Sequence, residues 1–199
     1  DDDPAMVRLA AAALTAHGFT DLEHVATGRD ALLAAARADV LLLDQNLLAA
    51  GKSFFEVGDA VVSQDNRLLA WAEDSVGRRQ FVLRVKDLAS GKLLDDCVPN
   101  IEPNLVWADD NRTLVYIDKD PVTLLSKRVK AHVLGTPTAQ DAQLYEEADE
   151  SFYLSISRTR SDQFICVTSD STVSSEVRCT PAAKPGQFTV LAPRQRDIE

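Results

Sequence analysis

The sequence predicts a mixed fold in two parts. Residues 1–50 are expected to form a partial parallel α/β segment, and residues 51–199 mainly antiparallel β structure, arranged as about three blades of an open, incomplete β-propeller. Apolar residues recur at helical spacing before Gly51, whereas apolar and polar residues alternate with a period of two after it. The second part also repeats itself about every 45 to 50 residues, a length typical of four short strands.

Composition and charge exclude several classes of function. The chain has 199 residues, of which 45% are hydrophobic and 26% charged, as in an ordinary globular protein. Its formal net charge of -10 repels phosphate backbones, so we expect no nucleic-acid partner. The apolar runs are too short to span a bilayer, and the first residues do not form a secretion signal, so we expect no membrane partner.

The three cysteines are Cys97, Cys166 and Cys179. They form no close-spaced pair, and their odd number argues against a disulfide framework. The sequence therefore predicts three reduced thiols and a cytoplasmic protein.

The first part alternates between helical and extended patterns. We expect helices over residues 5–17 and 29–38, and strands over residues 21–26 and 40–44. Alternating α/β order predicts parallel strands, whose carboxyl ends meet at one edge of the sheet. Acidic residues at that edge would suit a divalent cation.

Two stretches of this part, "DDDPAMVRLAAAALTAHGF" and "DVLLLDQN", resemble the receiver domain of response regulators. By that resemblance Asp44 would accept a phosphoryl group. Mg2+ would be bound by Asp2, by Asp1 through water, by Asp44, and by the backbone carbonyl of Asn46. The resemblance implies phosphorylation-dependent signalling, as in a phosphorelay, with Mg2+ as cofactor. The alternative is that these acids are solvated charges at a helix start and a strand end.

The second part contains a repeated turn. The sequence "DNR" at residues 65–67 recurs at residues 110–112, and a weaker copy, "SDQ", stands at residues 161–163. Each copy is a polar turn that leads into an apolar strand. The three copies predict blades over residues 54–97, 98–146 and 147–195.

A later strand of each repeat alternates between apolar and polar residues. The predicted inward residues are Phe81, Leu83 and Val85 in the first repeat, Val129, Ala131 and Val133 in the second, and Val177 and Cys179 in the third. The predicted outward residues are Arg84 and Lys86, then Arg128, Lys130 and His132, then Glu176 and Arg178. The aromatic residues Trp71, Trp107 and Tyr116 are expected in the blade cores. The acidic run at residues 146–150 is expected to be a solvated loop, with attraction of basic peptides as the alternative.

Three longer stretches carry a second resemblance. They are "RLLAWAEDSVGRRQFVLRVKDLASGKLL", "VWADDNRTLVYIDKDP" and "ESFYLSISRTRSDQFICVTSDSTVSSEVR". They resemble consecutive parts of the N-terminal propeller of oligopeptidase B, in the prolyl oligopeptidase family, over about residues 54–194. The resemblance implies a serine peptidase that cleaves short peptides after basic residues. Its propeller covers a catalytic triad on a separate α/β-hydrolase domain and excludes folded proteins.

The sequence contains no G-x-S-x-G elbow, the strained turn that exposes the nucleophile of such a hydrolase domain. We therefore predict no catalytic residue and no cofactor for the propeller part, and a role in controlling peptide access. The expected partners are peptides or a hydrolase domain, together with self-association through uncovered blade faces. A truncated or fused product without selected activity is a further alternative.

Overall fold

The structure is a computed structural model that describes residues 42–195. The chain divides into two units, residues 1–50 and 51–199, and each is described by itself. In the first unit the described residues contain the one-turn helix α3 (Gln45–Ala49). Asp44 precedes it as the N-cap, and the backbone N–H of Leu47 donates to its Oδ1 over 3.0 Å. Asp44 was predicted to end a strand, but residues 42–44 have no regular secondary structure and Asp44 begins a helix instead.

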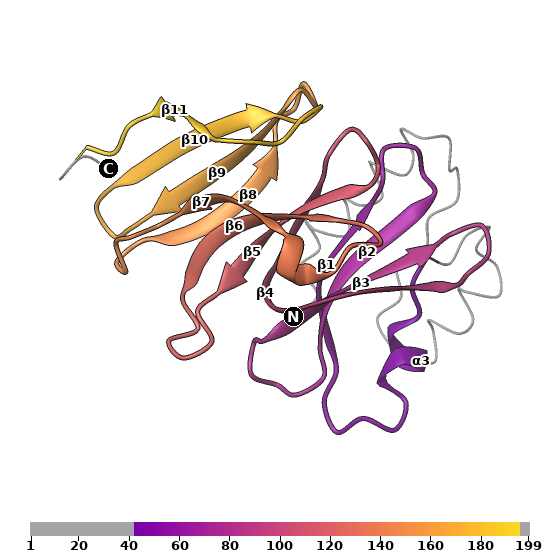
Figure 1. The fold of residues 1–199 in the computed structure, drawn as a ribbon. Helices are drawn as coiled ribbons and strands as arrows, with labels where there is room; N and C mark the ends of the chain where they lie inside the picture. Colours follow the sequence, from indigo (N-terminus) through magenta and orange to yellow (C-terminus); the bar gives the residue numbers. More distant parts are fainter. Residues whose placement is uncertain (1–41, 196–199) are drawn as a thin grey trace. The chain divides into compact units, whose positions relative to one another are not determined.

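The second unit consists of two antiparallel sheets (Figure 1). Their strands follow one another in space in the order of the sequence. The first sheet contains β1 (Glu56–Val62), β2 (Leu68–Asp74), β3 (Phe81–Asp87), β4 (Leu93–Trp107), β5 (Thr113–Lys119), β6 (Ser126–Val133) and β7 (Ala142–Glu146). The second contains β8 (Tyr153–Arg158), β9 (Phe164–Asp170), β10 (Ser175–Pro181) and β11 (Thr189–Ala192). A short 3-10 turn (Thr138–Gln140) precedes β7.

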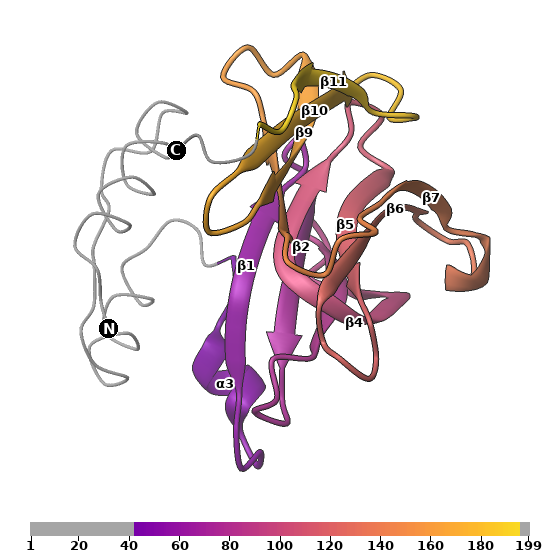
Figure 2. The same cartoon turned by 90° about the vertical axis from the view of Figure 1, so that its left-hand side faces the viewer.

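The long strand β4 belongs to two groups of strands. Its residues 93–101 pair with β3, whereas its residues 101–107 pair with β5, and the register shifts between Ile101 and Leu105. We therefore call β1 to β3 with residues 93–101 blade 1, and residues 102–107 with β5 to β7 blade 2. Blade 3 is β8 to β11, which Figure 2 shows as a layer of its own. The mainly antiparallel fold in four-stranded groups fits the predicted propeller fragment.

The repeated turn has the same backbone conformation in each blade. Its middle residue adopts a positive φ at Asn66 (59°), Asn111 (54°) and Asp162 (58°). Asn and Asp tolerate the left-handed region better than other non-glycine residues, which explains why the repeat keeps them there. The predicted repeat is confirmed, including its weaker third copy.

Two apolar cores lie between successive blades. One joins residues of β2 and β3 to residues of β4 and β5, and the other joins β4 to β6 with β8 and β9. The predicted inward residues of the first repeat, Phe81, Leu83 and Val85, are all buried. In the second repeat Val129 and Ala131 are buried as predicted, but Val133 is 38% exposed.

The prediction that His132 faces outward is wrong, because its side chain is only 1% exposed. In the third repeat, Glu176 was also predicted to face outward but is buried, whereas Val177 and Cys179 are half-buried. A blade in a stack has covered residues on both faces of its sheet. Alternation along one strand therefore does not tell which face meets solvent.

The cysteine prediction is also wrong. Cys166 and Cys179 lie directly opposite each other on β9 and β10 and form a disulfide, with their Cα atoms 4.1 Å apart. Cys97 is a free and exposed thiol. The pairing depends on the register of two strands, which the spacing of cysteines along the sequence does not reveal.

Within residues 42–195, no helix has the length and apolar character needed to cross a membrane.

Candidate functional site

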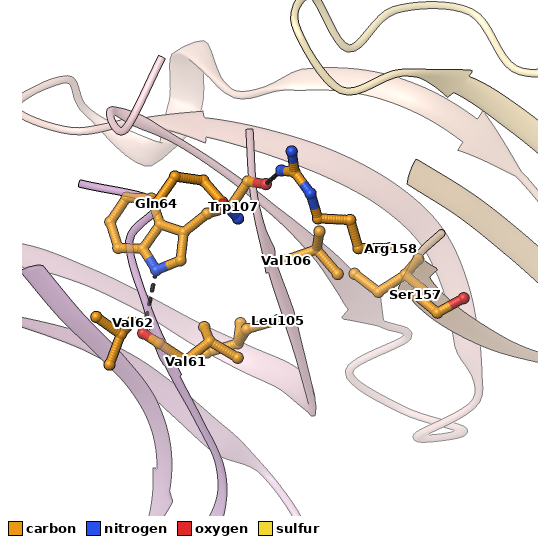
Figure 3. Close-up of a pocket in the computed structure, with 9 residues that line it drawn as sticks. Val61, Val62, Gln64, Leu105, Val106, Trp107, Ser157 and Arg158 are labelled. Atoms are coloured by element: carbon orange, nitrogen blue, oxygen red, sulfur yellow. Dashed lines mark hydrogen bonds between the residues drawn. The ribbon is translucent and has the colours of Figure 1, made fainter. Parts of the chain in front are cut away.

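The first strands of the three blades meet around a small pocket. They are β1, residues 102–107 of β4, and β8. The pocket has a volume of about 290 Å3 and is shown in Figure 3. It is lined by Val61, Val62, Gln64, Leu105, Val106, Trp107, Ile156, Ser157 and Arg158. Most of these side chains are apolar, so the pocket suits an apolar group more than an ion.

Polar side chains hold these first strands together. Asp59 of β1 accepts a hydrogen bond from the backbone N–H of Leu105 over 2.9 Å. Asn104, at the equivalent position of blade 2, accepts one from the N–H of Ile156 in blade 3 over 2.6 Å. The same device therefore recurs at both junctions between blades. It satisfies backbone donors that no neighbouring strand reaches.

Two further hydrogen bonds cross the same junctions, and both are drawn in Figure 3. The indole Nε1 of Trp107 donates to the carbonyl of Val61 over 3.1 Å. The guanidinium Nη1 of Arg158 donates to the carbonyl of Trp107 over 2.7 Å. Trp107, which was predicted to lie in a blade core, is buried and also links blade 1 to blade 2.

Among the described residues that line the pocket, Arg158 has the only cationic side chain. Its Nη2 donates to a carboxylate oxygen of Asp109 and to the carbonyl of Asp162, and its Nε lies 3.3 Å from the carboxylate of Asp162. Because these partners engage Nη1 and Nη2, Arg158 is a structural link between blades 2 and 3; its buried Nε makes no hydrogen bond. It is poorly placed to bind the carboxylate of a peptide.

Asp59 lies on β1, one of the strands that line the pocket, and has a shifted pKa. Its burial raises the pKa of the carboxyl group, while the N–H groups of Leu105 and Ala60 lower it, and the net effect is a pKa above the ordinary value of 3.8. The charged form of Asp59 is therefore less favourable in the folded protein than in water.

A second polar network lies at the outer part of the junction between blades 1 and 2. His132 of β6 is placed between two carboxylates: its Nε2 lies 3.0 Å from Asp96 of β4, and its Nδ1 lies 2.8 Å from Asp141. The hydroxyl of Tyr116 donates to Asp141 over 2.8 Å, and the N–H of Gly135 donates to Asp96 over 2.6 Å. Burial and the carboxylate of Asp141 raise the pKa of Tyr116.

The His132 network links residues that are far apart in the sequence. Asp96 is 36 residues from His132, and no local pattern marks the three side chains as partners. Both imidazole nitrogens and both carboxylates have partners within the protein. We therefore interpret the network as a structural link and not as a catalytic group.

A third polar cluster joins β10 of blade 3 to the segments that precede β8 and follow β11. Arg194 pairs with Glu147 over 2.7 Å and with Glu176 over 3.3 Å, and its guanidinium stacks on the ring of Phe152. Burial by itself would raise the pKa of Glu147, but hydrogen bonds from Arg194, the Asp149 N–H and Tyr145 hold it below its usual value. Glu147 belongs to the acidic run that was predicted to be solvated. That prediction is wrong for this residue, because an arginine distant in the sequence covers it.

The sequence-predicted phosphoryl and metal site is not assembled in the described part of the chain. Asp44 caps α3, and Asn46 lies in the first turn of that helix. Asp1 and Asp2 lie outside the described residues. Among residues 42–195, no group of three or more His, Cys, Asp and Glu side chains is arranged to hold a metal ion.

The fold and the pocket define a class of protein: a segment of a β-propeller whose blades are joined through their first strands. The profile of the prolyl oligopeptidase N-terminal beta-propeller domain matches residues 21–199. The chain therefore belongs to the prolyl oligopeptidase family, as part of its N-terminal propeller.

Comparisons with individual proteins agree. The chain is 67% identical over 159 residues to dipeptidyl aminopeptidase BI of Pseudoxanthomonas mexicana, an alignment that covers 80% of this chain and 22% of that protein. It is 31% identical to protease 2 of Moraxella lacunata, over 84% of this chain and 24% of that protein. The structure of oligopeptidase B from Leishmania major matches with a TM-score of 0.74 and 25% identity, over 78% of this chain and 22% of that one.

These comparisons bear on two expectations. The family match begins at residue 21 and so includes most of the segment that resembles a receiver, and nothing supports the receiver resemblance or the signalling function that it implies. The comparisons support the resemblance to oligopeptidase B only as membership of the prolyl oligopeptidase family; they do not single out oligopeptidase B within it. The chain spans about a fifth of the length of the relatives, 22% of the first and 24% of the second.

Proposed function

We propose that this chain is the part of a propeller that controls the access of peptides to the catalytic domain of a dipeptidyl aminopeptidase-like serine peptidase. The chain itself is non-catalytic. The observation that carries the proposal is the 67% identity to dipeptidyl aminopeptidase BI over 159 residues. The peptides would be short chains with a free amino terminus, from which dipeptides are released.

The contacts between blades give this role a physical basis. Asp59, Asn104, Trp107 and Arg158 tie each first strand to the next through side-chain-to-backbone hydrogen bonds. Such bonds hold the first strands at fixed distances without a continuous ladder between blades. A fixed inner wall can admit an extended peptide and exclude a folded protein. The catalytic serine, with its base, would come from a separate hydrolase domain.

A second candidate keeps the same role but changes the substrate. The likeness to oligopeptidase B from Leishmania major, with a TM-score of 0.74, favours peptides that are cleaved after basic residues. The two candidates differ in whether a free amino terminus is required, so one assay separates them.

The test uses a chimera in which residues 42–195 replace the corresponding segment of the Pseudoxanthomonas mexicana enzyme. We expect the chimera to cleave a fluorogenic dipeptidyl amide with a free amino terminus and to leave a folded protein intact. The 199-residue chain alone should cleave neither. Preference for amino-blocked substrates with basic residues would favour the oligopeptidase B-like candidate. Turnover by the isolated chain that a serine-directed reagent blocks would refute its non-catalytic role.

A further inference from the structure

Asp59 of β1 is a half-buried carboxylate without a cationic partner. Its Oδ2 accepts a hydrogen bond from the N–H of Leu105 and its Oδ1 accepts one from the N–H of Ala60, each over 2.9 Å. No Lys, Arg or His among the described residues forms an ion pair with it. A carboxylate has about four sites that accept hydrogen bonds, so both oxygens of Asp59 keep room for a further donor.

Other shielded carboxylates are neutralised within the protein. Glu73 pairs with Arg84 over 3.4 Å, and Asp118 pairs with Arg128 over 2.7 Å. At Asp59, burial raises the pKa of the carboxyl group, and the two N–H donors offset this effect only in part. The ionised form of Asp59 therefore has a cost in free energy that a cation beside it would remove.

The hydrogen bond that Asp59 makes between blades does not require a charge. Asp59 and Asn104 each stand seven residues before the left-handed residue of their repeated turns. Asn104 accepts an N–H of blade 3 over 2.6 Å through a neutral amide oxygen, as Asp59 accepts an N–H of blade 2. An asparagine at position 59 would thus serve the fold without the cost of a shielded charge. A carboxylate at this position indicates a role other than holding the blades together.

The carboxylate of Asp59 lies beside the apolar pocket between the first strands (Figure 3). Leu105, whose N–H it accepts, lines this pocket, and so does Val61 on the same strand as Asp59. An apolar cavity of about 150 Å3 holds a benzene molecule, so the volume of about 290 Å3 has room for one apolar side chain. Arg158 on the pocket wall is neutralised by Asp109. The charge beside the pocket that lacks a partner is therefore the negative charge of Asp59.

We infer that Asp59 and the pocket bind the free amino terminus of a peptide, with the ammonium group at the carboxylate and the side chain of the first residue in the pocket. A metal ion fits the site poorly, because residues 42–195 contain no group of three His, Cys, Asp and Glu side chains arranged to hold one. The net charge of -10 also attracts cationic ligands. The inference rests on the proposed function, since the choice of an amino terminus over a lysine side chain follows from the proposed substrate.

The first experiment titrates the isotope-labelled 199-residue chain with leucinamide, which carries an ammonium group and one apolar side chain. N-acetyl-leucinamide lacks the charge, and glycinamide lacks the side chain. We expect leucinamide to shift the NMR signals of the Leu105 amide and the Trp107 indole N–H, and to bind at least about tenfold more tightly than either analogue. Equal binding of the three compounds, or shifts confined to other parts of the chain, would overturn the inference.

The second experiment separates the charge of Asp59 from its place in the fold. Asp59→Asn keeps an acceptor for the N–H of Leu105, so the variant should melt no lower than the wild type. Asp95→Asn is the matched control, because it removes one negative charge from an exposed position of β4 that does not line the pocket. We expect leucinamide to bind at least about tenfold more weakly to the first variant and with unchanged affinity to the second.

Two results of this comparison would contradict the inference. An equal loss of affinity in both variants would assign binding to the net charge of the chain. Unchanged affinity in both variants would remove Asp59 from the site. The source of the ammonium group is tested with N-acetyl-lysinamide, which carries it on a side chain. Tighter binding of this compound than of leucinamide would assign the site to basic side chains, against the inference.

The third experiment uses the chimera described above and separates this inference from the proposed function. Asp59→Asn should raise the KM of the chimera for the dipeptidyl amide about tenfold and leave kcat unchanged, because the contact is lost equally in the ground state and the transition state. A chimera that cleaves the substrate with the same KM with and without the substitution would refute the inference and leave the proposed function standing. A chimera without turnover would contradict the proposed function, and the titrations of the chain would still decide the inference.

Discussion

Gly58 of blade 1 lies against Pro103 of blade 2, and replacing it tests the packing between the two blades. A Cβ added to Gly58 would lie 2.3 Å from the Cβ of Pro103 and 2.7 Å from the ring of Phe81. Carbon atoms in contact need about 3.5 Å or more, so β1 and β4 would have to separate by roughly 1 Å. Such overpacking typically costs about 1 to 3 kcal/mol, and the cost is at the upper end here because Pro103 is rigid.

For a chain of this length, a loss of about 3 kcal/mol lowers the melting temperature by about 6 to 12 °C. The assay is urea denaturation of Gly58→Ala beside Gly186→Ala, a matched control. The nearest atom to an added Cβ at Gly186 is 4.0 Å away, and neither glycine has a positive φ. We expect a lower urea midpoint for the first variant and a change within about 0.5 kcal/mol for the second. Equal effects of the two substitutions would refute the close approach of β1 and β4.

Three further predictions concern buried polar groups. Because the pKa of Asp59 is raised above 3.8, its ionisation opposes folding as pH rises from 3.8 through the folded pKa; Asp59→Asn should remove this loss in a pH series of urea midpoints. Burial alone would raise the pKa of Asp74, but four backbone N–H groups hold it below 3.8, so its stabilising effect is present above 3.8 and lost as pH falls through the folded pKa. Asp74→Asn should therefore destabilise the protein at pH 7 and flatten its loss of stability in acid, as measured by the same series. Finally, His132→Leu should cost about 3 kcal/mol in urea denaturation, because each of its two buried carboxylate partners loses a hydrogen-bond contact.

Each of these has an outcome that contradicts it. Asp59→Asn keeps an acceptor oxygen for the neighbouring N–H, as Asn104 does in blade 2, so a large loss of stability at pH 7 would mean that the negative charge itself is needed. An unchanged acid profile for Asp74→Asn would show that its N–H donors do not affect titration. A His132→Leu variant within about 1 kcal/mol of the wild type would mean that the carboxylates find other partners.

The repeat of the propeller part could be predicted because its signals are local. Each turn requires one residue in the left-handed conformation, which is Asn66, Asn111 or Asp162. These residues can be recognised from their immediate neighbours in the sequence. The inward positions of Phe81, Leu83 and Val85 follow from alternation within one strand. The absence of the G-x-S-x-G elbow from the sequence is likewise a local observation.

The errors came from short motifs and from contacts across the fold. The receiver resemblance rested on acidic residues and one apolar run, a pattern that occurs in many strand and helix ends. The outward assignment of Glu176 failed because Arg194, which neutralises it, lies on another segment. The outward assignment of His132 failed for the same reason, because its partner Asp96 comes from the neighbouring blade.

The sequence by itself determined the number of repeats, their turns and the family to which they belong, because these depend on residues close together in the chain. Only the tertiary structure decided which residues meet across blades. The Cys166–Cys179 bond depends on the register of β9 and β10, and the contact of Asp59 with Leu105 depends on the stacking of blade 1 on blade 2. Strand register and blade stacking depend on the total burial of apolar side chains from many segments. That total cannot be read from any single stretch of sequence.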